Sequence, residues 1–383
     1  MTCGLLWWWW WCHRPQPPKP QPCPPKPPPP CPDPCFLPGT MLATDQRDKS
    51  IEQFKVGDLI KTYDWRTNSS FYKPVIWVGK RQAKIDRSLP DDQAGYPVRI
   101  LANAFSTGLP YKDMLVTAEH CLFFNNSFVP ARMLINGRSI FYDKSFSAYE
   151  YYHIETQEHS VIVADGTLTE SYLNTGNHAS FQQEGKIVSL PNQTRPKTWE
   201  GDAAAPLIVD RDKVEPLHAQ FTNKAIEAGI ESKIAEPELT HDPDLHLITE
   251  SGHVIRKIRE KDGSIVFMVP PDVSTVRLVS RVSRPVDTIG PYVDDRRQLG
   301  VLVSDITFFE GGKTRSITEH LKNPDLTGWN PSEQDTSRWS SGNAVLPLGP
   351  RRPRSIGMLA VKVLTSGPYL IEQEPEHAAP VRA

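Results

Sequence analysis

This 383-residue sequence lacks an excess of charge of either sign. Lysine and arginine number 43, and aspartate and glutamate number 45, so the formal net charge is -2. Proteins that hold nucleic acid or an acidic membrane surface usually carry a clear basic excess. The balance argues against a polyanion as the main partner, and we predict no nucleic-acid binding.

Cysteine is scarce outside the first part of the chain. Of six cysteines, Cys3, Cys12, Cys23 and Cys31 come early, and only Cys35 and Cys121 follow. A body with so few cysteines is not a small scaffold stapled by disulfides. The early cysteines and His13 lack the close C-x2-C pair typical of structural zinc, so we predict no metal and no other cofactor.

Residues 1–34 lack the composition of a packed core. They open with MTCGLLWWWWWCHR, in which no Lys or Arg precedes the apolar run, and Trp prefers the membrane interface to the hydrocarbon core. The proline-rich run that follows is expected to be an extended, disordered tether, because proline fixes φ and removes a backbone donor. Location stays open, and an exported or cell-surface protein is the expectation that such a tether suggests.

Helical periodicity of useful length is absent before residue 181. Short β-rich runs such as DLIKTYDW and DMLVTAEHCLFF alternate there with Gly, Pro, Asn and Asp. Further on, EPLHAQFTNKAIEAGIES predicts one amphipathic helix that stops near Gly229, followed by more alternating runs. The sequence therefore predicts a mainly β protein with a disordered tail (1–34), an all-β domain (35–181), and a helix plus antiparallel β-sandwich (182–383).

Cys35 stands where the tail meets the first domain, in CPDPCFLPGT. A cysteine there can attack the carbonyl carbon of the preceding residue and convert the peptide bond into a thioester, an N-to-S acyl shift. The departing nitrogen needs a proton, which an imidazole can supply, and the intermediate needs hydrogen-bond donors. Thr117 and His120, three residues apart, can line one turn beside such a cysteine. A buried structural thiol is the alternative for Cys35.

CFLPGTMLATDQRDKSIEQFKVGDLIKTYD resembles the opening block of the Hint family, the fold shared by inteins and Hedgehog autoprocessing domains. DMLVTAEHCLFF carries the family's Thr-x-x-His motif, and YYHIETQEHSVIVADGTLTESY resembles its closing block, in a style close to bacterial Hint domains outside inteins. The resemblance implies Cys35 as nucleophile, His120 as general acid and Thr117 as stabiliser. It implies an assisting role for His153, which occupies a position where many inteins carry Asp; a structural hydrogen bond is an equal alternative.

Two departures from the family pattern narrow the prediction. Inteins end on His-Asn, whereas this chain reads Glu170-Ser171-Tyr172, so no cyclising Asn is present and full splicing is not expected. Pro34 precedes Cys35, and its ring restricts the rotation that an acyl shift requires. We therefore predict single-turnover autocatalytic cleavage before Cys35 rather than a turnover enzyme. The substrate is the chain's own N-terminal peptide, and water or an unknown external nucleophile resolves the thioester.

The alternative function is a catalytically degenerate Hint scaffold that serves as a surface adhesion or carbohydrate-binding protein. Pro34 favours this alternative. In the C-terminal module, Trp329 and Trp339 can stack on a sugar face or close the sandwich, and core closure is favoured because buried Trp is common. A carbohydrate or another surface ligand is the partner that this alternative predicts.

Overall fold

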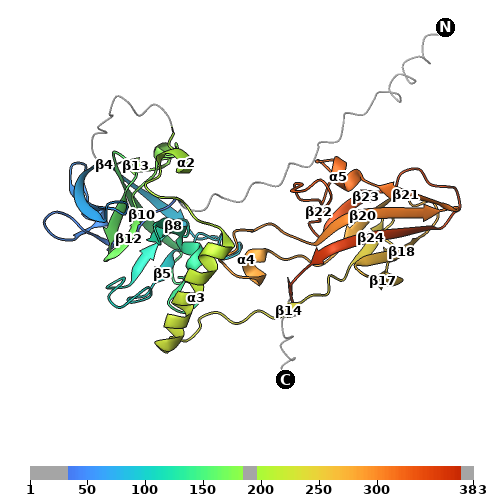
Figure 1. Ribbon diagram of the computed structural model, residues 1–383, viewed down its shortest axis with the longest axis horizontal. Coiled ribbons are helices and arrows are strands. Elements are labelled where there is room, and N and C mark those ends of the chain that lie inside the picture. The colour runs from blue at the N-terminus through green and yellow to red at the C-terminus, as the bar shows by residue number, and fades with distance from the viewer. Residues whose placement is uncertain (1–32, 184–195, 372–383) are drawn as a thin grey trace, which may run out of the picture.

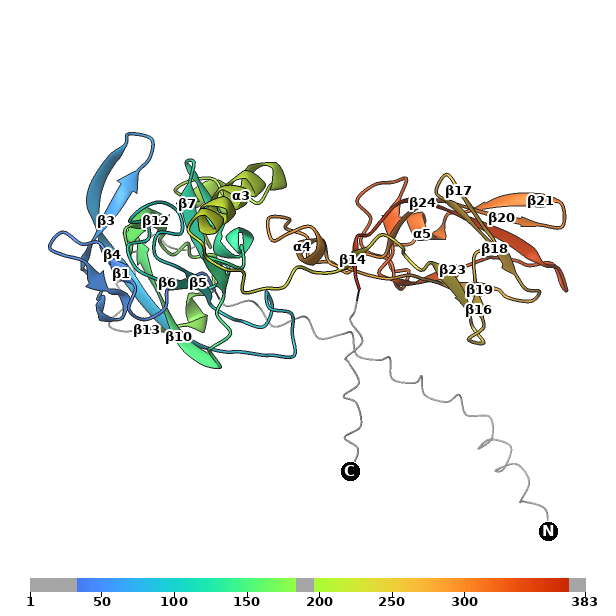
Figure 2. The same cartoon turned by 90° about the horizontal axis from the view of Figure 1, so that it is seen from below.

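The computed structural model describes residues 33–183 and 196–371, so the Trp run, the tail cysteines and nearly all of the proline-rich tether lie outside the described residues. Two β-rich lobes lie at opposite ends of an elongated molecule, with α4 (Pro285–Thr288) between them (Figures 1 and 2). The predicted mainly β fold is confirmed. No helix in the described ranges combines the length and apolar character that a membrane crossing requires.

The first lobe is built on a ten-stranded antiparallel assembly whose main path runs β10-β4-β3-β11-β12-β7-β8. Its strands are β1 (Met41–Leu42), β2 (Lys49–Ser50), β3 (Leu59–Asp64), β4 (Ser69–Lys84), β7 (Cys121–Phe124), β8 (Ser127–Pro130), β10 (Ala148–Thr156), β11 (Val161–Ala164), β12 (Thr167–Glu170) and β13 (Gln182–Gln183). Asp165 and Gly166 join β11 to β12 with φ of 48° and 83°. Two consecutive positive φ values are what a tight two-residue hairpin turn needs, and Asp-Gly supplies them.

A second, three-stranded sheet completes this lobe. It consists of β6 (Met114–Val116), β5 (Val98–Ile100) and β9 (Ile140–Tyr142), and short 3-10 turns η1 (Ile51–Gln53), η2 (Ala131–Leu134) and η3 (His178–Ser180) connect the strands. Apolar side chains from both sheets form one buried cluster, in which Ile60, Val98, Met114 and Ile154 are fully buried. The lobe therefore closes around one main core, with two smaller buried clusters beside it.

The long helix α3 (Arg211–Glu227) packs on the core of the first lobe. Its buried side chains Val214, Leu217 and Phe221 join that core, and the Phe221 ring lies 5.0 Å from the ring of Phe105. We predicted this helix as part of the C-terminal module, but its apolar side faces the first lobe. It also starts earlier than the sequence suggested and ends before Gly229, whose φ is 69°. A shorter helix, α2 (Trp199–Asp202), is capped by the Thr198 hydroxyl.

The second lobe is an antiparallel sandwich of two sheets. One sheet holds β16 (Val254–Ile255), β15 (His246–Thr249), β19 (Thr275–Val279) and β23 (Asn343–Pro347), and the other holds β17 (Arg259–Lys261), β18 (Ser264–Val269), β24 (Gly357–Ser366), β20 (Val301–Glu310), β21 (Lys313–Ile317) and β22 (Arg338–Trp339). Leu247 and Leu278 of one sheet and Phe267 and Phe308 of the other share one buried cluster. Helix α5 (Glu319–Lys322) and the pair β14 (Leu239–Thr240) and β25 (Tyr369–Leu370) complete it.

Trp329 lies in the core of this sandwich, where its indole N–H donates to the carbonyl of Val345 at 2.9 Å. Trp339 is half-buried on β22. The prediction that Trp329 closes the core is therefore confirmed.

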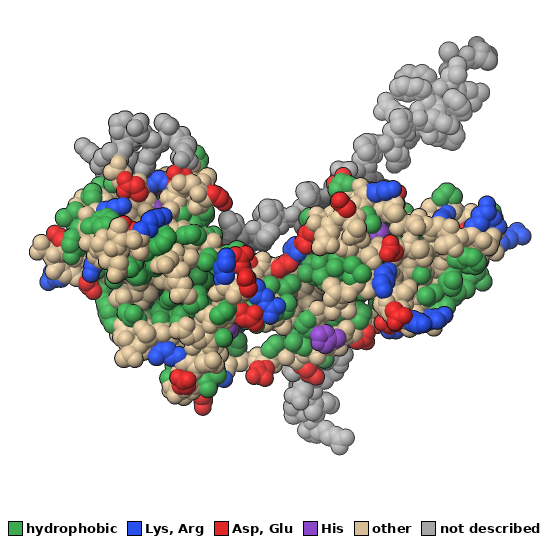
Figure 3. Space-filling model, viewed as in Figure 1, with side chains coloured by type: hydrophobic (Ala, Val, Ile, Leu, Met, Phe, Trp, Pro, Cys, Tyr) green, Lys and Arg blue, Asp and Glu red, His purple; other side chains and the backbone are tan. Residues whose placement is uncertain are grey.

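Ion pairs join the segment around α4 to the first lobe, and Figure 3 shows acidic and basic side chains gathered between the lobes on the visible face. The buried guanidinium of Arg284 lies 2.7 Å from the Asp92 carboxylate, and Arg296 lies 2.8 Å from Glu119. Buried ion pairs are weak evidence for stability, but they fix how two surfaces meet. They hold this segment beside Glu119, the residue before His120.

Candidate active site around Cys35

Cys35 opens a short extended segment that lies between β10 and β6 of the first lobe. The N–H of Phe36 donates to the carbonyl of Tyr152 at 2.9 Å, and the N–H of Tyr152 returns a bond to Phe36 at 2.8 Å. On the other side, the N–H of Thr117 donates to the Cys35 carbonyl at 2.9 Å. Successive side chains of an extended chain point to opposite faces. Cys35 and Phe36 therefore enter two different buried clusters.

Thr117 contacts the backbone on both sides of Pro34. Its hydroxyl oxygen accepts the N–H of Cys35 at 2.8 Å, and the hydroxyl donates to the carbonyl of Asp33 at 2.8 Å. Thr117 is fully buried, so no water competes for these bonds. The hydroxyl is thus placed at the nitrogen that leaves in an acyl shift before Cys35.

Asp33 and Pro34 are ordered with the domain, although the sequence predicted disorder through residue 34. The Asp33 carboxylate accepts from Arg81 on β4 at 3.1 Å and from the side-chain amide of Asn177 at 2.5 Å. Asn177 in turn accepts a bond from the hydroxyl of Tyr172. The chain therefore enters the domain two residues before Cys35.

The thiol of Cys35 sits in an aromatic cluster with Trp77, Tyr151 and Tyr172. Burial, and then the negative charges of Asp33 and Glu170, raises the pKa of this thiol well above its usual value. The thiol is therefore protonated at neutral pH, and it becomes a nucleophile only when a base removes that proton.

His120 shares a turn with Thr117, to whose carbonyl its N–H donates at 3.1 Å, and its ring packs on Phe36 at 4.3 Å. The ring nitrogen Nε2 lies 2.5 Å from the hydroxyl oxygen of Thr169, and that hydroxyl donates to the carbonyl of Cys121. Nε2 therefore carries the ring proton and Nδ1 carries a lone pair. Nδ1 has no hydrogen-bond partner within the described residues. Burial lowers the pKa of His120 to about 3, so the ring is neutral at pH 7.

His153 lies on β10, with its ring 5.4 Å from the ring of His120 and 5.3 Å from that of Tyr172. Its Nδ1 accepts the N–H of Ile154 at 3.0 Å, so Nε2 carries the proton. Burial, followed by the neighbouring rings of His120 and His159, lowers the pKa of His153. The structure thus brings the two candidate histidines together, and both rings lie against the ring of Phe36.

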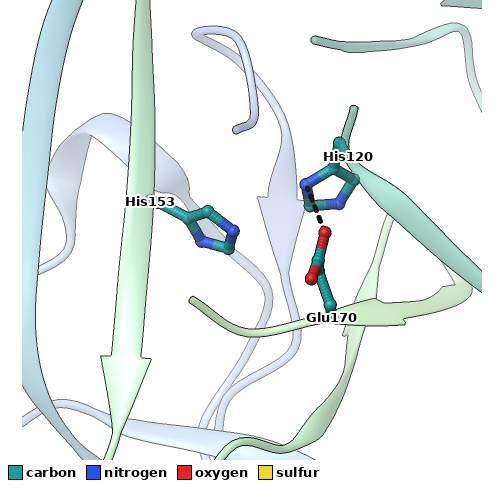
Figure 4. A group of neighbouring side chains, drawn as sticks. All are labelled: His120, His153 and Glu170. Atoms are coloured by element: carbon teal, nitrogen blue, oxygen red, sulfur yellow. Dashed lines mark ion pairs between the residues drawn. The ribbon is translucent and has the colours of Figure 1, made fainter. Parts of the chain in front are cut away.

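Glu170 is a site residue that sequence reasoning missed. Its buried carboxylate accepts the N–H of Cys121 at 2.6 Å and lies 3.9 Å from Nδ1 of His120 (Figure 4). The other carboxylate oxygen lies 3.7 Å from Nε2 of His159, whose Nδ1 accepts the N–H of Ala204. The sequence drew attention to this position only because it lacks the intein Asn. The signal that could have identified Glu170 is an acidic residue at the end of a buried hairpin strand, because acidic side chains are rarely buried without a partner.

His120, His153 and Glu170 each offer one ligand atom within 4.8 Å of the others (Figure 4). Zinc bonds of about 2.1 Å in a tetrahedron require ligand atoms about 3.4 Å apart, so these side chains would have to move inward. Nδ1 of His153 accepts the N–H of Ile154, so Nε2 carries the ring proton. Neither nitrogen of this ring therefore has a lone pair available for a metal ion. This arrangement suits proton exchange among the three groups better than metal ligation.

The first lobe matches a known protein family. The family model for the Hint domain matches residues 34–176. This chain carries a Hint domain. Similar solved structures include a bacterial intein-like domain from Clostridium thermocellum, with 15% identity, a TM-score of 0.27, and coverage of 36% of this chain and 98% of that one. A DnaB intein from Synechocystis sp. PCC 6803 has 11% identity and a TM-score of 0.26, covering 37% of this chain and 99% of that one.

No curated protein matches the chain. The matched range includes every residue that the resemblance singled out, namely Cys35, Thr117, His120 and His153. The predicted Hint-type domain is therefore confirmed, while the roles of the individual residues stay predictions.

Proposed function

We propose that the Hint domain cleaves its own chain between Pro34 and Cys35 through a thioester. The observation that supports this most directly is the Thr117 hydroxyl, which holds the N–H of Cys35 on one side and the carbonyl of Asp33 on the other. A hydrogen bond at the leaving nitrogen orients the bond to be broken.

The reaction conserves atoms and protons over two steps. In the first, Sγ of Cys35 bonds to the carbonyl carbon of Pro34, the bond from that carbon to the Cys35 nitrogen breaks, and the thiol proton ends on that nitrogen. In the second, water bonds to the same carbon, the carbon–sulfur bond breaks, and Sγ regains a proton. The products are residues 1–34 with a free carboxylate and residues 35–383 with an N-terminal cysteine.

Proton movement is assigned to His120 and Thr117. His120 is neutral and has a free lone pair, so it can take a proton, and Glu170 can stabilise the resulting cation from 3.9 Å. His120 shares a turn with Thr117, whose hydroxyl contacts the leaving nitrogen, so we assign His120 as the source of the proton that this nitrogen takes up. His153, beside the His120 ring, assists by holding it in place.

The surroundings of Cys35 favour a second candidate function, a Hint scaffold that no longer cuts. The Cys35 thiol is fully buried, its pKa is raised, and a proline precedes it. In this case the sandwich carries the activity, as a module that binds a carbohydrate or another surface ligand.

Intact-mass spectrometry separates the two candidates. Purified full-length protein is incubated with and without dithiothreitol, beside a Cys35→Ala variant. We expect loss of residues 1–34 from the wild type only, slowly with water alone and faster with dithiothreitol, whose thiol attacks the thioester more readily than water. An unchanged mass under every condition would overturn the cleavage proposal and leave the scaffold.

A further inference from the structure

The contacts around Asp33 go beyond what the cleavage chemistry needs. Thr117 already positions the scissile nitrogen, yet Arg81 and Asn177 bind the side chain of a residue that takes no part in the reaction. These two donors come from distant parts of the domain, one from β4 and the other from the loop after β12. Two converging donors on one carboxylate are typical of a recognition site for that group.

We propose that the Hint domain carries a subsite for an acidic side chain two residues before its nucleophile, formed by Arg81 and Asn177. The ligand class is a peptide segment with a carboxylate at this position, here the chain's own Asp33. The proposal rests on the proposed cleavage and adds a sequence requirement to it.

Burial distinguishes this contact from an ordinary surface ion pair. The side chain of Asp33 is 18% exposed and that of Arg81 is 43% exposed, so the carboxylate is the more enclosed partner. Isolated surface pairs contribute little, but a carboxylate held by two side-chain donors has a defined orientation. The carbonyl of Asp33 is held as well, by Thr117, so backbone and side chain are fixed together.

The subsite is connected to the wall of the nucleophile's pocket. Asn177 donates to Asp33 through its amide nitrogen and accepts from Tyr172 through its amide oxygen. Tyr172 belongs to the aromatic cluster that surrounds the Cys35 thiol. Filling the subsite therefore fixes a side chain beside the thiol, and an empty subsite would leave both Asn177 and the entering chain less constrained.

The first test compares first-order cleavage rates of full-length variants under dithiothreitol. Arg81→Ala removes the cation, and Asn177→Asp places a second carboxylate against Asp33 without changing the shape of the side chain. We expect each to slow cleavage about tenfold, the effect of losing one well-formed charged contact. Lys84→Ala, at an exposed cation on the same strand, is the matched control and is expected to cleave at the wild-type rate.

A charge exchange keeps the test independent of folding defects. Asp33→Arg alone is expected to slow cleavage, and its combination with Arg81→Asp is expected to recover most of the lost rate. Rates of Arg81→Ala and Asn177→Asp that stay within twofold of the control would overturn the subsite.

A second readout does not depend on cleavage. In a Cys35→Ala background, hydrogen exchange of the residue 35 amide reports whether the junction is held, because this amide donates to Thr117. We expect Arg81→Ala to speed this exchange about tenfold relative to Lys84→Ala. A chain that shows this coupling but never cleaves would overturn the proposed function alone, whereas cleavage without the coupling would overturn the subsite alone.

Discussion

The two lobes are both antiparallel β structures with apolar cores, yet a buried arginine of the sandwich and two buried histidines of the Hint domain differ in their hydrogen bonding. In the sandwich, the buried guanidinium of Arg338 donates to the carbonyls of His320, Asn323 and two further residues. In the Hint domain, the equally buried rings of His120 and His153 each keep a nitrogen that lacks a partner within the described residues. A buried polar group with all its hydrogen bonds made holds loops in place. Buried polar groups that converge without hydrogen-bond partners mark a site of chemistry.

The largest effect on cleavage is expected from a substitution of Cys35. Cys35→Ala removes the only atom proposed to attack Pro34, so we expect no release of residues 1–34, measured by intact mass. Cys121→Ala is the matched control, because Cys121 is the other buried free thiol of the domain and packs without a proposed role. If the Cys121 variant also fails to cleave while it stays folded, the assignment of a single nucleophile is wrong.

A substitution of Thr117 tests whether its hydroxyl acts in cleavage or only in packing. Thr117→Val keeps the shape of the side chain and removes both bonds to the junction, so we expect cleavage to slow about a hundredfold. Thr167→Val is the control, because the buried hydroxyl of Thr167 has no hydrogen-bond partner within the described chain. Equal rates for the two variants, followed by gel or mass spectrometry, would show that the hydroxyl of Thr117 is structural only.

A substitution of Arg338 tests the structural role of the hydrogen-bonded buried arginine in the sandwich. Arg338→Met leaves buried carbonyls without donors, so we expect the sandwich to lose about 3 kcal/mol of unfolding free energy. Denaturant unfolding measures this loss. The cleavage rate of the Hint domain is expected to stay unchanged, and a parallel loss of cleavage would contradict a purely structural role for this arginine.

Acid should weaken the Hint domain more than the sandwich. The folded pKa of His120 is lowered to about 3, and that of His153 is lowered as well, so the unfolded chain binds protons first as the pH falls below about 6.5. Stability is full above that pH and falls by about 1.4 kcal/mol per pH unit for each such histidine. In the sandwich, burial lowers the pKa of one histidine, His320.

Unfolding of the Cys35→Ala chain at pH 7 and pH 4.5, followed lobe by lobe with hydrogen exchange, measures this difference. His153→Gln is expected to reduce the acid sensitivity of the Hint domain. Equal acid sensitivity of the two lobes would contradict the lowered pKa values.

The sequence predicted most of the fold because strands and turns leave local signals. Alternation in the β runs and the stop of the helix near Gly229 have local physical causes, and the structure contains both. The packing of α3 on the first lobe was not predictable, since an apolar helix face does not name its partner.

The site residues also differ in whether a local pattern in the sequence could indicate them. Cys35, Thr117 and His120 could be proposed from the sequence because motif spacing is visible along the chain. Asp33, Arg81, Asn177 and Glu170 were not, because their contacts join residues far apart in the sequence.

The central claim is that a thioester forms at Pro34. Hydroxylamine attacks thioesters, so incubation of the full-length chain with hydroxylamine at neutral pH, followed by mass spectrometry of the released N-terminal peptide, tests it directly. We predict a peptide of residues 1–34 that carries a hydroxamate on Pro34, and none from Cys35→Ala. Release of this peptide only as the free acid at an unchanged rate, or no release at all, would contradict the account.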